Sequence, residues 1–332
     1  MRAKQIAVGV LVVALFALPL FTRDPYYLHI LIIAGIQCVL AVGFWMLLSA
    51  GNITVAQASF LGIGSYMSVI LVMKLGWTFW EAFPICGIIA GIFGLLLGLP
   101  TLRLRGVYFV MVTVGFGMIL RTVWARYWWA FGFHTGVIDI PAPGSISLFG
   151  LYTIEFSSTS KVSFYYLTMI FVAVILFTVY RLTHSRVGLT FAAIRSADDL
   201  SASVGIDLSR YRVIAFTLVC FFAGITGSLY AHYSSFISNE NFGFQQSANV
   251  LMATVIGGTG AFAGPIIGTG FMALLSEVLR PLQEYIPLVQ GAILILVMVF
   301  MPGGIWGAVQ SGADWTKQRR SLAPKAVPEK PS

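Results

Sequence analysis

Long apolar runs follow one another along almost the whole chain, separated by short polar connections. Crossing about 30 Å of hydrocarbon takes about 20 helical residues, and every backbone polar group must find its partner within the helix. A composition of 58% hydrophobic and 10% charged residues agrees with this pattern. The sequence therefore predicts an all-α integral membrane protein of about ten transmembrane helices. The spans are expected at residues 5–21, 28–49, 56–75, 82–100, 107–130, 164–181, 212–236, 248–262, 265–280 and 287–305.

The basic residues predict how these spans are oriented. The first run resembles a signal peptide, but no small-residue cleavage site follows it before Arg23 and Asp24, so we expect an uncleaved span. With the N-terminus placed inside the cell, 14 of the 20 Lys and Arg fall on the cytoplasmic side. Both termini are therefore expected in the cytoplasm, and the net charge of +8 reflects topology rather than nucleic-acid binding.

This topology divides the chain into a transmembrane domain, 1–310, and a basic tail, 311–332. The tail is expected to be disordered and attracted to anionic membrane lipid. The longest cytoplasmic connection is a loop at 183–211, and the longest outer connection is a loop at 132–163. The outer loop is rich in turn residues, and two roles remain open for it: docking an external partner or capping the bundle.

Two glycine-rich segments, 51–66 and 255–270, lie in the first and second halves of the chain. Glycine at this density allows helices to approach closely, or to break where the backbone is buried in protein or lines a wet cavity. Paired interrupted segments in two halves are typical of a solute path between repeats. Broken spans and tight helix packing are both open interpretations of these glycines.

Several kinds of chemistry have no signature in the sequence. The chain contains no Gly-x-x-x-x-Gly-Lys-Ser/Thr phosphate loop, no His/Glu cluster at metal-ligand spacing, and no evident Ser, His and Asp constellation. Cys38, Cys86 and Cys220 lie far apart inside apolar runs. Charged residues are nearly absent from the span centres, which argues against a proton or sodium relay. No cofactor is expected in this chain, and energy for uphill transport would have to come from elsewhere.

The polar stretch "FAAIRSADDLSASVGID" (191–207) stands out in the cytoplasmic loop. It predicts two short helices, Leu189–Arg195 and Ala197–Val204. Ser196 is expected to cap the second helix with Asp199 as its capping-box partner, Asp198 is favoured by the helix dipole, and Gly205 ends the helix. A helical surface of small residues suits insertion into a groove of another protein, while a solvated connector is the alternative.

With this stretch included, the sequence resembles the integral-membrane permeases of ABC importers, and more narrowly the LivM type of branched-chain or hydrophobic amino acid permease. Six segments match in order: "ITVAQASFLGIGSYMSVIL" (53–71), "LPTLRLRGVYFVMVTVGFGMIL" (99–120), "SRVGLTFAAIRSADDLSASVGID" (185–207), "AFTLVCFFAGITGSLYAHYSSFISNENF" (215–242), "VIGGTGAFAGPIIGTGFMALLSEVLR" (255–280) and "MPGGIWG" (301–307). The sequence departs from the family at "TVAQA" (54–58), where Ser-Leu-Gly-Gln-Ala is common, and at "FHTG" (133–136). Both departures bear on the substrate more than on the fold. The resemblance implies transport of branched-chain or hydrophobic amino acids, or of a related small amide or carboxylate.

The resemblance implies an importer half of the cobalamin-importer type in the bacterial inner membrane. Its partners would be a second permease of the LivH type, two cytoplasmic ATPases that carry ATP and Mg²⁺, and a periplasmic or lipid-anchored binding protein. It further implies that the coupling helices, which sit in a cleft on the ATPase, include Ala193, Ile194, Arg195, Ser196, Ala197, Asp198, Asp199 and Gly205.

Uncharged polar residues on the spans are candidates for the solute path, because an amino acid needs a few polar contacts between apolar walls. Hydrogen-bond glue between helices is the alternative role for each of them. An ATP-independent channel or facilitator for a small neutral solute such as urea remains an alternative function. The path candidates are Gln57, Ser59, Ser65, Tyr108, Thr113, Gly257, Gly258 and Gly260.

Overall fold

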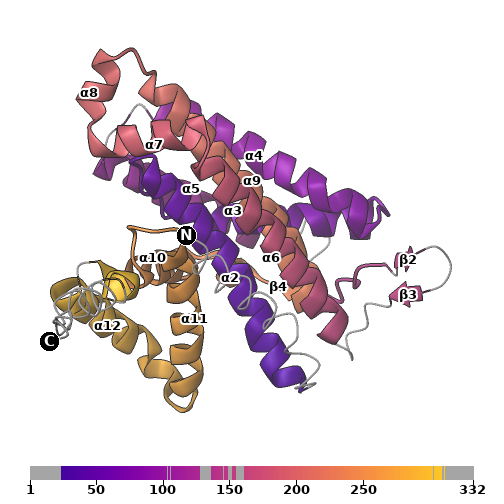
Figure 1. The fold of residues 1–332 in the computed structure, drawn as a ribbon. Helices are drawn as coiled ribbons and strands as arrows, with labels where there is room; N and C mark the ends of the chain where they lie inside the picture. Colours follow the sequence, from indigo (N-terminus) through magenta and orange to yellow (C-terminus); the bar gives the residue numbers. More distant parts are fainter. Residues whose placement is uncertain are drawn as a thin grey trace, which may run out of the picture.

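The computed structural model describes residues 24–102, 104, 106–127, 136–144, 146–148, 152–154, 161–301, 303–308 and 310. Within these ranges the chain is mainly helical, and its long helices lie side by side in a bundle (Figure 1). The helices are α2 (Pro25–Ser49), α3 (Gln57–Val69), α4 (Phe79–Thr101), α5 (Val107–Tyr127), α6 (Lys161–Thr183), α7 (Arg186–Ser196), α8 (Asp198–Ser203), α9 (Leu208–Ser234), α10 (Phe244–Gly257), α11 (Ala263–Val278) and α12 (Ile286–Phe300).

Six segments of the described chain are long and apolar enough to cross a membrane: Pro25–Ser49, Phe79–Thr101, Val107–Arg126, Lys161–Thr183, Leu208–Ser234 and Ile286–Ala308. A helix occupies every span predicted from residue 28 onward, whereas the span predicted at 5–21 lies outside the described residues. α10 and α11 have 14 and 16 residues, about 21 and 24 Å at 1.5 Å per residue, so each is shorter than the hydrocarbon core. The count of ten spans therefore stays a prediction.

The third predicted span, 56–75, has a mixed helical geometry. α3 contributes 13 residues and passes directly into a π-helical turn, η1 (Ile70–Lys74). Twelve of the 13 residues of α3 are buried, so this helix lies inside the bundle rather than at its surface. The glycine-rich segment 51–66 is therefore a turn followed by a buried helix, and its helix is not broken within 57–69.

α9 is the central helix of the bundle and packs between α3 and α4. A Cβ atom on Gly64 of α3 would lie 1.9 Å from the carbonyl oxygen of Gly224 on α9, and one on Gly224 would lie 2.3 Å from the Cβ of Ala90 on α4. Real Cβ atoms essentially never come that close to such neighbours. Glycine at these positions is thus required by the closeness of the helices, as small-residue packing in membranes predicts.

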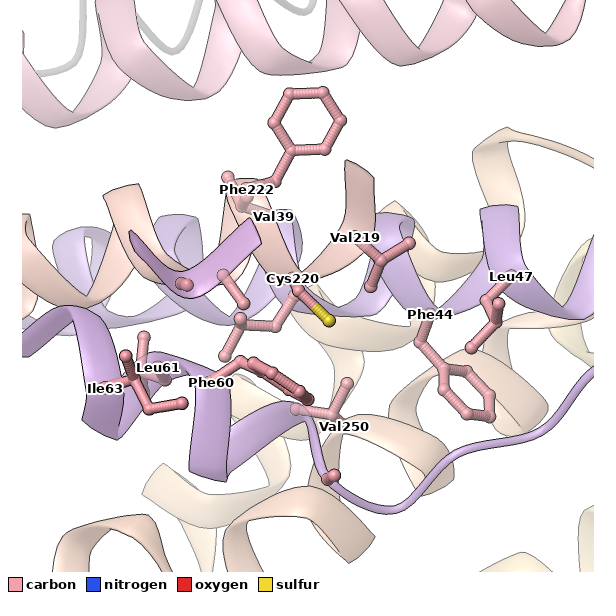
Figure 2. Packing of buried hydrophobic residues seen from close by; sticks show 14 of the residues in the cluster. Val39, Phe44, Leu47, Phe60, Leu61, Ile63, Val219, Cys220, Phe222 and Val250 are labelled. Carbon is pink, nitrogen blue, oxygen red and sulfur yellow. The ribbon is translucent and has the colours of Figure 1, made fainter. Parts of the chain in front are cut away.

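The largest apolar cluster collects side chains from helices that are distant in sequence (Figure 2). Phe44 comes from α2, Phe60 from α3, Val219 and Cys220 from α9, and Val250 from α10. The three cysteines are free and buried, which agrees with a packing role. This cluster fixes the positions of α2, α3, α9 and α10 relative to one another.

α10 and α11 form an antiparallel hairpin around the second glycine-rich segment. A Cβ on Gly257 would lie 1.9 Å from the carbonyl oxygen of Gly264, and one on Gly268 would lie 1.8 Å from that of Ala253. Between the helices the chain turns through Gly258, whose φ of 110° lies in the region that glycine adopts readily. Here both interpretations of the glycines apply: the segment breaks at residues 258–262, and the glycines on either side allow close packing.

Two small strand pairs lie on the connections between helices. β1 (Val137–Ile138) pairs antiparallel with β4 (Phe236–Ile237), and β2 (Ile146–Leu148) pairs antiparallel with β3 (Tyr152–Ile154). His232 Nδ1 lies 2.7 Å from the carbonyl oxygen of Pro141. The part of the outer loop at 136–144 is therefore attached to the end of α9, as a cap would be. Docking of an external partner on this loop stays a prediction. Two short 3₁₀ segments, η3 (Asn239–Phe242) and η4 (Arg280–Tyr285), complete the described connections.

Candidate functional site

The polar stretch in the middle of the chain forms two short helices, α7 and α8, at one end of the long helices (Figure 1). Ala197, with φ −158° and ψ 92°, is extended and separates α7 from α8. Gly205 follows the last turn of α8 with a φ of 90°, and its N–H donates to the carbonyl of Ala202. The predicted pair of helices and the predicted stop at Gly205 are confirmed.

The predicted cap of the second helix is wrong. Ser196 is the last residue of α7, and its hydroxyl donates to the carbonyl of Ala192 at 2.9 Å. Ala197 is the N-cap of α8 and offers no side-chain cap. The Ser196 hydroxyl binds back along its own helix because α7 extends through it, so it cannot cap the next one. Asp198 and Asp199 still lie in the first turn of α8, where the helix dipole favours carboxylates.

A largely buried ion pair connects α8 to α9. The Nη2 atom of Arg212 lies 2.7 and 2.6 Å from the two carboxylate oxygens of Asp198. The Arg212 side chain is 8% exposed and that of Asp198 is 33% exposed. Asp198 therefore faces the membrane-spanning helices at least as much as the solvent, and it fixes α8 on the start of α9.

A second polar contact connects α7 to the α10–α11 turn. Arg195 Nη1 donates to the carbonyl oxygen of Thr259 at 3.3 Å, and the indole N–H of Trp45 on α2 donates to the same oxygen at 3.0 Å. Gly51, in the turn after α2, lies against the backbone of Arg195. Arg195 thus has an inward partner, which its sequence position alone does not reveal.

The predicted coupling residues divide between an inner and an outer face. Ile194 is buried at 1% exposure, and Ala197 and Asp198 are partly buried. Ala193, Arg195, Ser196, Asp199 and Gly205 are exposed. Three large apolar side chains are exposed on this element, namely Leu189 on α7 at 68%, Leu200 on α8 at 67% and Val204, the residue after α8, at 76%. Exposed apolar side chains on a largely polar element are what a protein-binding surface offers. We name Leu189, Leu200 and Val204 the outer apolar patch.

The candidate path residues on α3 and α5 are mostly buried in helix contacts. Gln57, Ser59, Ser65 and Thr113 are exposed by 3% or less. The Ser65 hydroxyl reaches the carbonyl oxygens of Leu61 and Gly227, at 3.0 and 2.8 Å, and so bonds α3 to α9.

Ser65 and Thr113 thus have local partners, whereas the Gln57 amide nitrogen finds none among the described residues. The Thr113 hydroxyl donates to the carbonyl of Val110 on its own helix. Ser59 faces α5, where its Oγ would lie 2.7 Å from a Cβ on Gly117. Because its hydroxyl donates to the carbonyl of Gly227 on the neighbouring helix α9, Ser65 acts as interhelical glue in this structure.

The remaining path candidates do not converge with these. Tyr108 is 69% exposed on α5, away from the bundle interior. Gly257 and Gly258 are packed against Gly264 and Gly303, while the position of a Cβ on Gly260 meets no atom within 4 Å. The structure does not bring the eight candidates together around one cavity. Their role in a solute path stays a prediction.

A cavity of about 550 Å³ lies elsewhere, between α2, α10, α11 and the start of α12. None of the eight path candidates lines it. Its polar lining includes the amide side chains of Gln37, Asn249 and Gln290. These residues lie far apart in sequence, and nothing in their local pattern distinguishes them from interhelical glue.

Charged groups lie at the end of this cavity that is remote from α7 and α8. The Tyr26 hydroxyl hydrogen-bonds to the Glu277 carboxylate and accepts a hydrogen bond from Arg280. Arg280 Nη1 lies 3.6 Å from Glu277 Oε1, and its guanidinium lies 4.9 Å from the centre of the Tyr26 ring. Within the described ranges no group of three or more His, Cys, Asp or Glu side chains is placed to hold a metal ion.

Comparisons of the sequence with known proteins match it to permease components of import systems. Residues 26–301 match the family model described as "Branched-chain amino acid transport system / permease component". The high-affinity branched-chain amino acid transport system permease proteins LivM of Salmonella typhimurium and Escherichia coli K12 are 31% and 32% identical over 294 residues. These matches cover 83% of this chain and 67% of each relative. The autoinducer 2 import system permease protein LsrC of Escherichia coli O9:H4 is 26% identical over 345 residues, covering 97% and 93%. No solved structure matches the chain.

Proposed function

Because the chain belongs to the family of branched-chain amino acid transport system permease components, we propose that it is the permease subunit of an ABC importer for branched-chain or other hydrophobic amino acids. As a family member with several apolar helices it is a multi-pass protein of the inner membrane, and its relatives are transport proteins rather than enzymes. The observation that carries the proposal is the α7–α8 element, which is held to the bundle on one face and presents the outer apolar patch on the other.

The proposed complex has five parts. Besides this chain it contains a second permease of the LivH type, two cytoplasmic ATPases that bind ATP and Mg²⁺, and a periplasmic or lipid-anchored binding protein. This chain would contribute ten spans, with both termini in the cytoplasm, in an arrangement of the cobalamin-importer type. α7 and α8 would then lie on the cytoplasmic side, where an ATPase can reach them.

In this proposal the ATPase binds the outer apolar patch, and its closure displaces α7 and α8. Two contacts transmit that displacement into the membrane. The Asp198–Arg212 pair connects α8 to α9, and the Arg195–Thr259 hydrogen bond connects α7 to the α10–α11 turn. Since α9 is the central helix of the bundle, a shift at its start is passed to α3 and α4 through their glycine contacts. Such coupled shifts of packed helices are a known route between two states.

The test is uptake into proteoliposomes that contain the permease pair, the ATPases and the binding protein. We expect uptake of radiolabelled leucine that requires ATP inside the vesicle, where the ATPases lie, together with the binding protein on the other face. The solute panel includes isoleucine, valine, phenylalanine, benzoate and urea, because the family resemblance extends to amides and carboxylates. Vesicles with the ATPases omitted, or with ATP replaced by a non-hydrolysable analogue, are the controls.

The alternative function predicts a different result. A channel or facilitator would equilibrate urea or another neutral solute without ATP, and removing the ATPases would leave the rate unchanged. ATP-independent equilibration by vesicles containing only this chain would therefore exclude the importer proposal.

A further inference from the structure

Gln290 is the most buried polar side chain of the cavity lining. Gln290 lies on α12 about 6 Å, or one turn, beyond Ile286, and it lines the cavity at only 3% exposure. An amide this deeply placed costs about 1–3 kcal/mol when it is left without a hydrogen bond, so a polar solute in the cavity gains by supplying one.

The lining of the cavity restricts which solute can supply that partner. Ile30 and Ile33 on α2, Met272 on α11 and Ile286 form apolar walls, and the amides of Gln37 and Asn249 offer further donors and acceptors. Among the described lining residues, the charged side chains Glu277 and Arg280 lie at one end beside Tyr26, and His29 lies about one turn further along α2. The interior is thus polar at a few points and nowhere charged.

An amino acid with an apolar side chain matches this distribution. Its ammonium group needs hydrogen-bond acceptors and its carboxylate needs donors, and a carboxamide provides both within one side chain. Net-charged solutes are disfavoured, because the interior holds no countercharge and a lone charge is costly to desolvate. The neutral zwitterion carries no net charge, and its side chain can lie on the isoleucine and methionine walls. A cavity of about 550 Å³ also falls within the usual range of about 300–1,000 Å³ for small-molecule sites.

We propose that this cavity binds a zwitterionic amino acid with an apolar side chain, held by the amides of Gln290, Gln37 and Asn249. The proposal rests on the proposed function, since it assigns a site to the substrate class named there. Glu277 and Arg280 form the entrance, where a charged group remains in contact with water. The site is separate from the path residues expected from the sequence, none of which lines it.

Two walls of this site belong to the hairpin that α7 holds. Asn249 lies on α10 and Met272 on α11, and the turn between these helices accepts the hydrogen bond from Arg195 at Thr259. A displacement of α7 therefore moves the hairpin and changes the shape of the cavity. Binding in the cavity and events at the cytoplasmic element are linked through one rigid part of the fold.

The experiment uses a cysteine reporter in the assembled importer, held in lipid nanodiscs. Ser276 lines the cavity, so we expect a membrane-impermeant maleimide to label the Ser276→Cys variant, and leucine to slow that labelling at least tenfold at saturation. The native cysteines give little background because all three are buried. Val278→Cys is the matched control: Val278 is 76% exposed on the same helix and outside the cavity lining, so leucine should leave its labelling unchanged.

Two further variants in the Ser276→Cys background test the chemistry of the site. Gln290→Met keeps the length of the side chain but removes the amide, and should raise the leucine concentration for half-protection about tenfold. Ala273→Trp fills the cavity and should abolish protection, while Leu274→Trp, on an exposed neighbour, should not. Probes that lack one charged group, 4-methylpentanoate and isoamylamine, should protect poorly.

The outcomes separate this proposal from the proposed function. If the complex imports leucine but leucine does not slow labelling of Ser276→Cys, the cavity site is wrong and the importer stands. Should leucine protect Ser276→Cys in a complex that imports none of the tested solutes, the site stands and the importer proposal fails. A third outcome would overturn the proposal. If Ser276→Cys is labelled slowly without leucine in phosphatidylethanolamine discs but quickly in detergent, the cavity is a lipid site.

Discussion

The ion pair between Asp198 and Arg212 allows a quantitative test of how the α7–α8 element is held on the bundle. Breaking a fully buried pair costs about 3–5 kcal/mol because one charge is left uncompensated, whereas an exposed pair contributes about 0–1 kcal/mol. Arg212 is 8% exposed and Asp198 is 33% exposed. We therefore expect an intermediate loss of about 2 kcal/mol for Asp198→Asn, which leaves Arg212 buried without its counter-ion.

A double-mutant cycle isolates this pair from other effects of substitution. The variants are Asp198→Asn, Arg212→Gln and the double variant, each unfolded at equilibrium with urea in detergent. Since the double variant buries no lone charge, it should be about 2 kcal/mol more stable than the sum of the single effects predicts. Glu284→Gln, at an exposed position, is the control and should stay within about 0.5 kcal/mol of the parent. A coupling energy below about 0.5 kcal/mol would refute the claim that this pair fixes α8 on α9.

Three shorter predictions follow from other contacts. Gly64→Ala should destabilise the bundle by about 1–3 kcal/mol in the same unfolding assay, because the new Cβ must push α9 away, whereas Gly115→Ala meets no atom within 4 Å and should be tolerated. Leu200→Asp should weaken binding of the ATPase to the permease at least tenfold in a pull-down titration while insertion and folding remain normal. Arg195→Glu and Asp199→Lys should each uncouple transport, so that ATP is hydrolysed without uptake; normal uptake by both would contradict a coupling role.

The positions of the helices could be predicted from the sequence because one rule dominates them. A backbone in hydrocarbon must form its hydrogen bonds internally, and about 20 apolar residues are needed to cross. The span predicted at 82–100 is therefore observed as Phe79–Thr101, and that at 164–181 as Lys161–Thr183. The rule does not decide whether α10 and α11 each cross the membrane, because helices of 14 and 16 residues are shorter than the length it requires.

Local capping chemistry was less predictable, as Ser196 shows. A serine followed three residues later by Asp199 satisfies the capping pattern, but the same hydroxyl can bind the carbonyl four residues earlier when the preceding helix continues through it. The sequence does not state which helix the serine belongs to. By contrast, Gly205 was predicted correctly because a φ of 90° after a helix favours glycine over every other residue type.

The solute path was the least predictable part because its signal is ambiguous. A serine or amide in an apolar span has the same sequence signature whether it faces a cavity or bonds to a neighbouring helix. Ser65 is used as glue, while Gln290 lines the cavity. Only the packing of α2, α10, α11 and α12 distinguishes the two cases, and that packing brings together residues from opposite ends of the chain.

Thr259 provides a final test of whether α7 drives the α10–α11 hairpin or only supports it. Its carbonyl oxygen has two lone pairs, and it accepts from Arg195 on α7 and from Trp45 on α2. Arg195→Met and Trp45→Phe each remove one hydrogen bond, worth about 1 kcal/mol, so both should lower stability modestly.

If α7 moves the hairpin, the two variants should differ in function. Only Arg195→Met cuts the connection to the moving element, so it should lower uptake per ATP hydrolysed by at least tenfold, while Trp45→Phe should leave this ratio near that of the parent. Proteoliposome uptake and ATP turnover, measured together, give the ratio for each. Equal losses in the two variants would mean that Thr259 is a structural anchor, since removing either donor would then act only by loosening the turn.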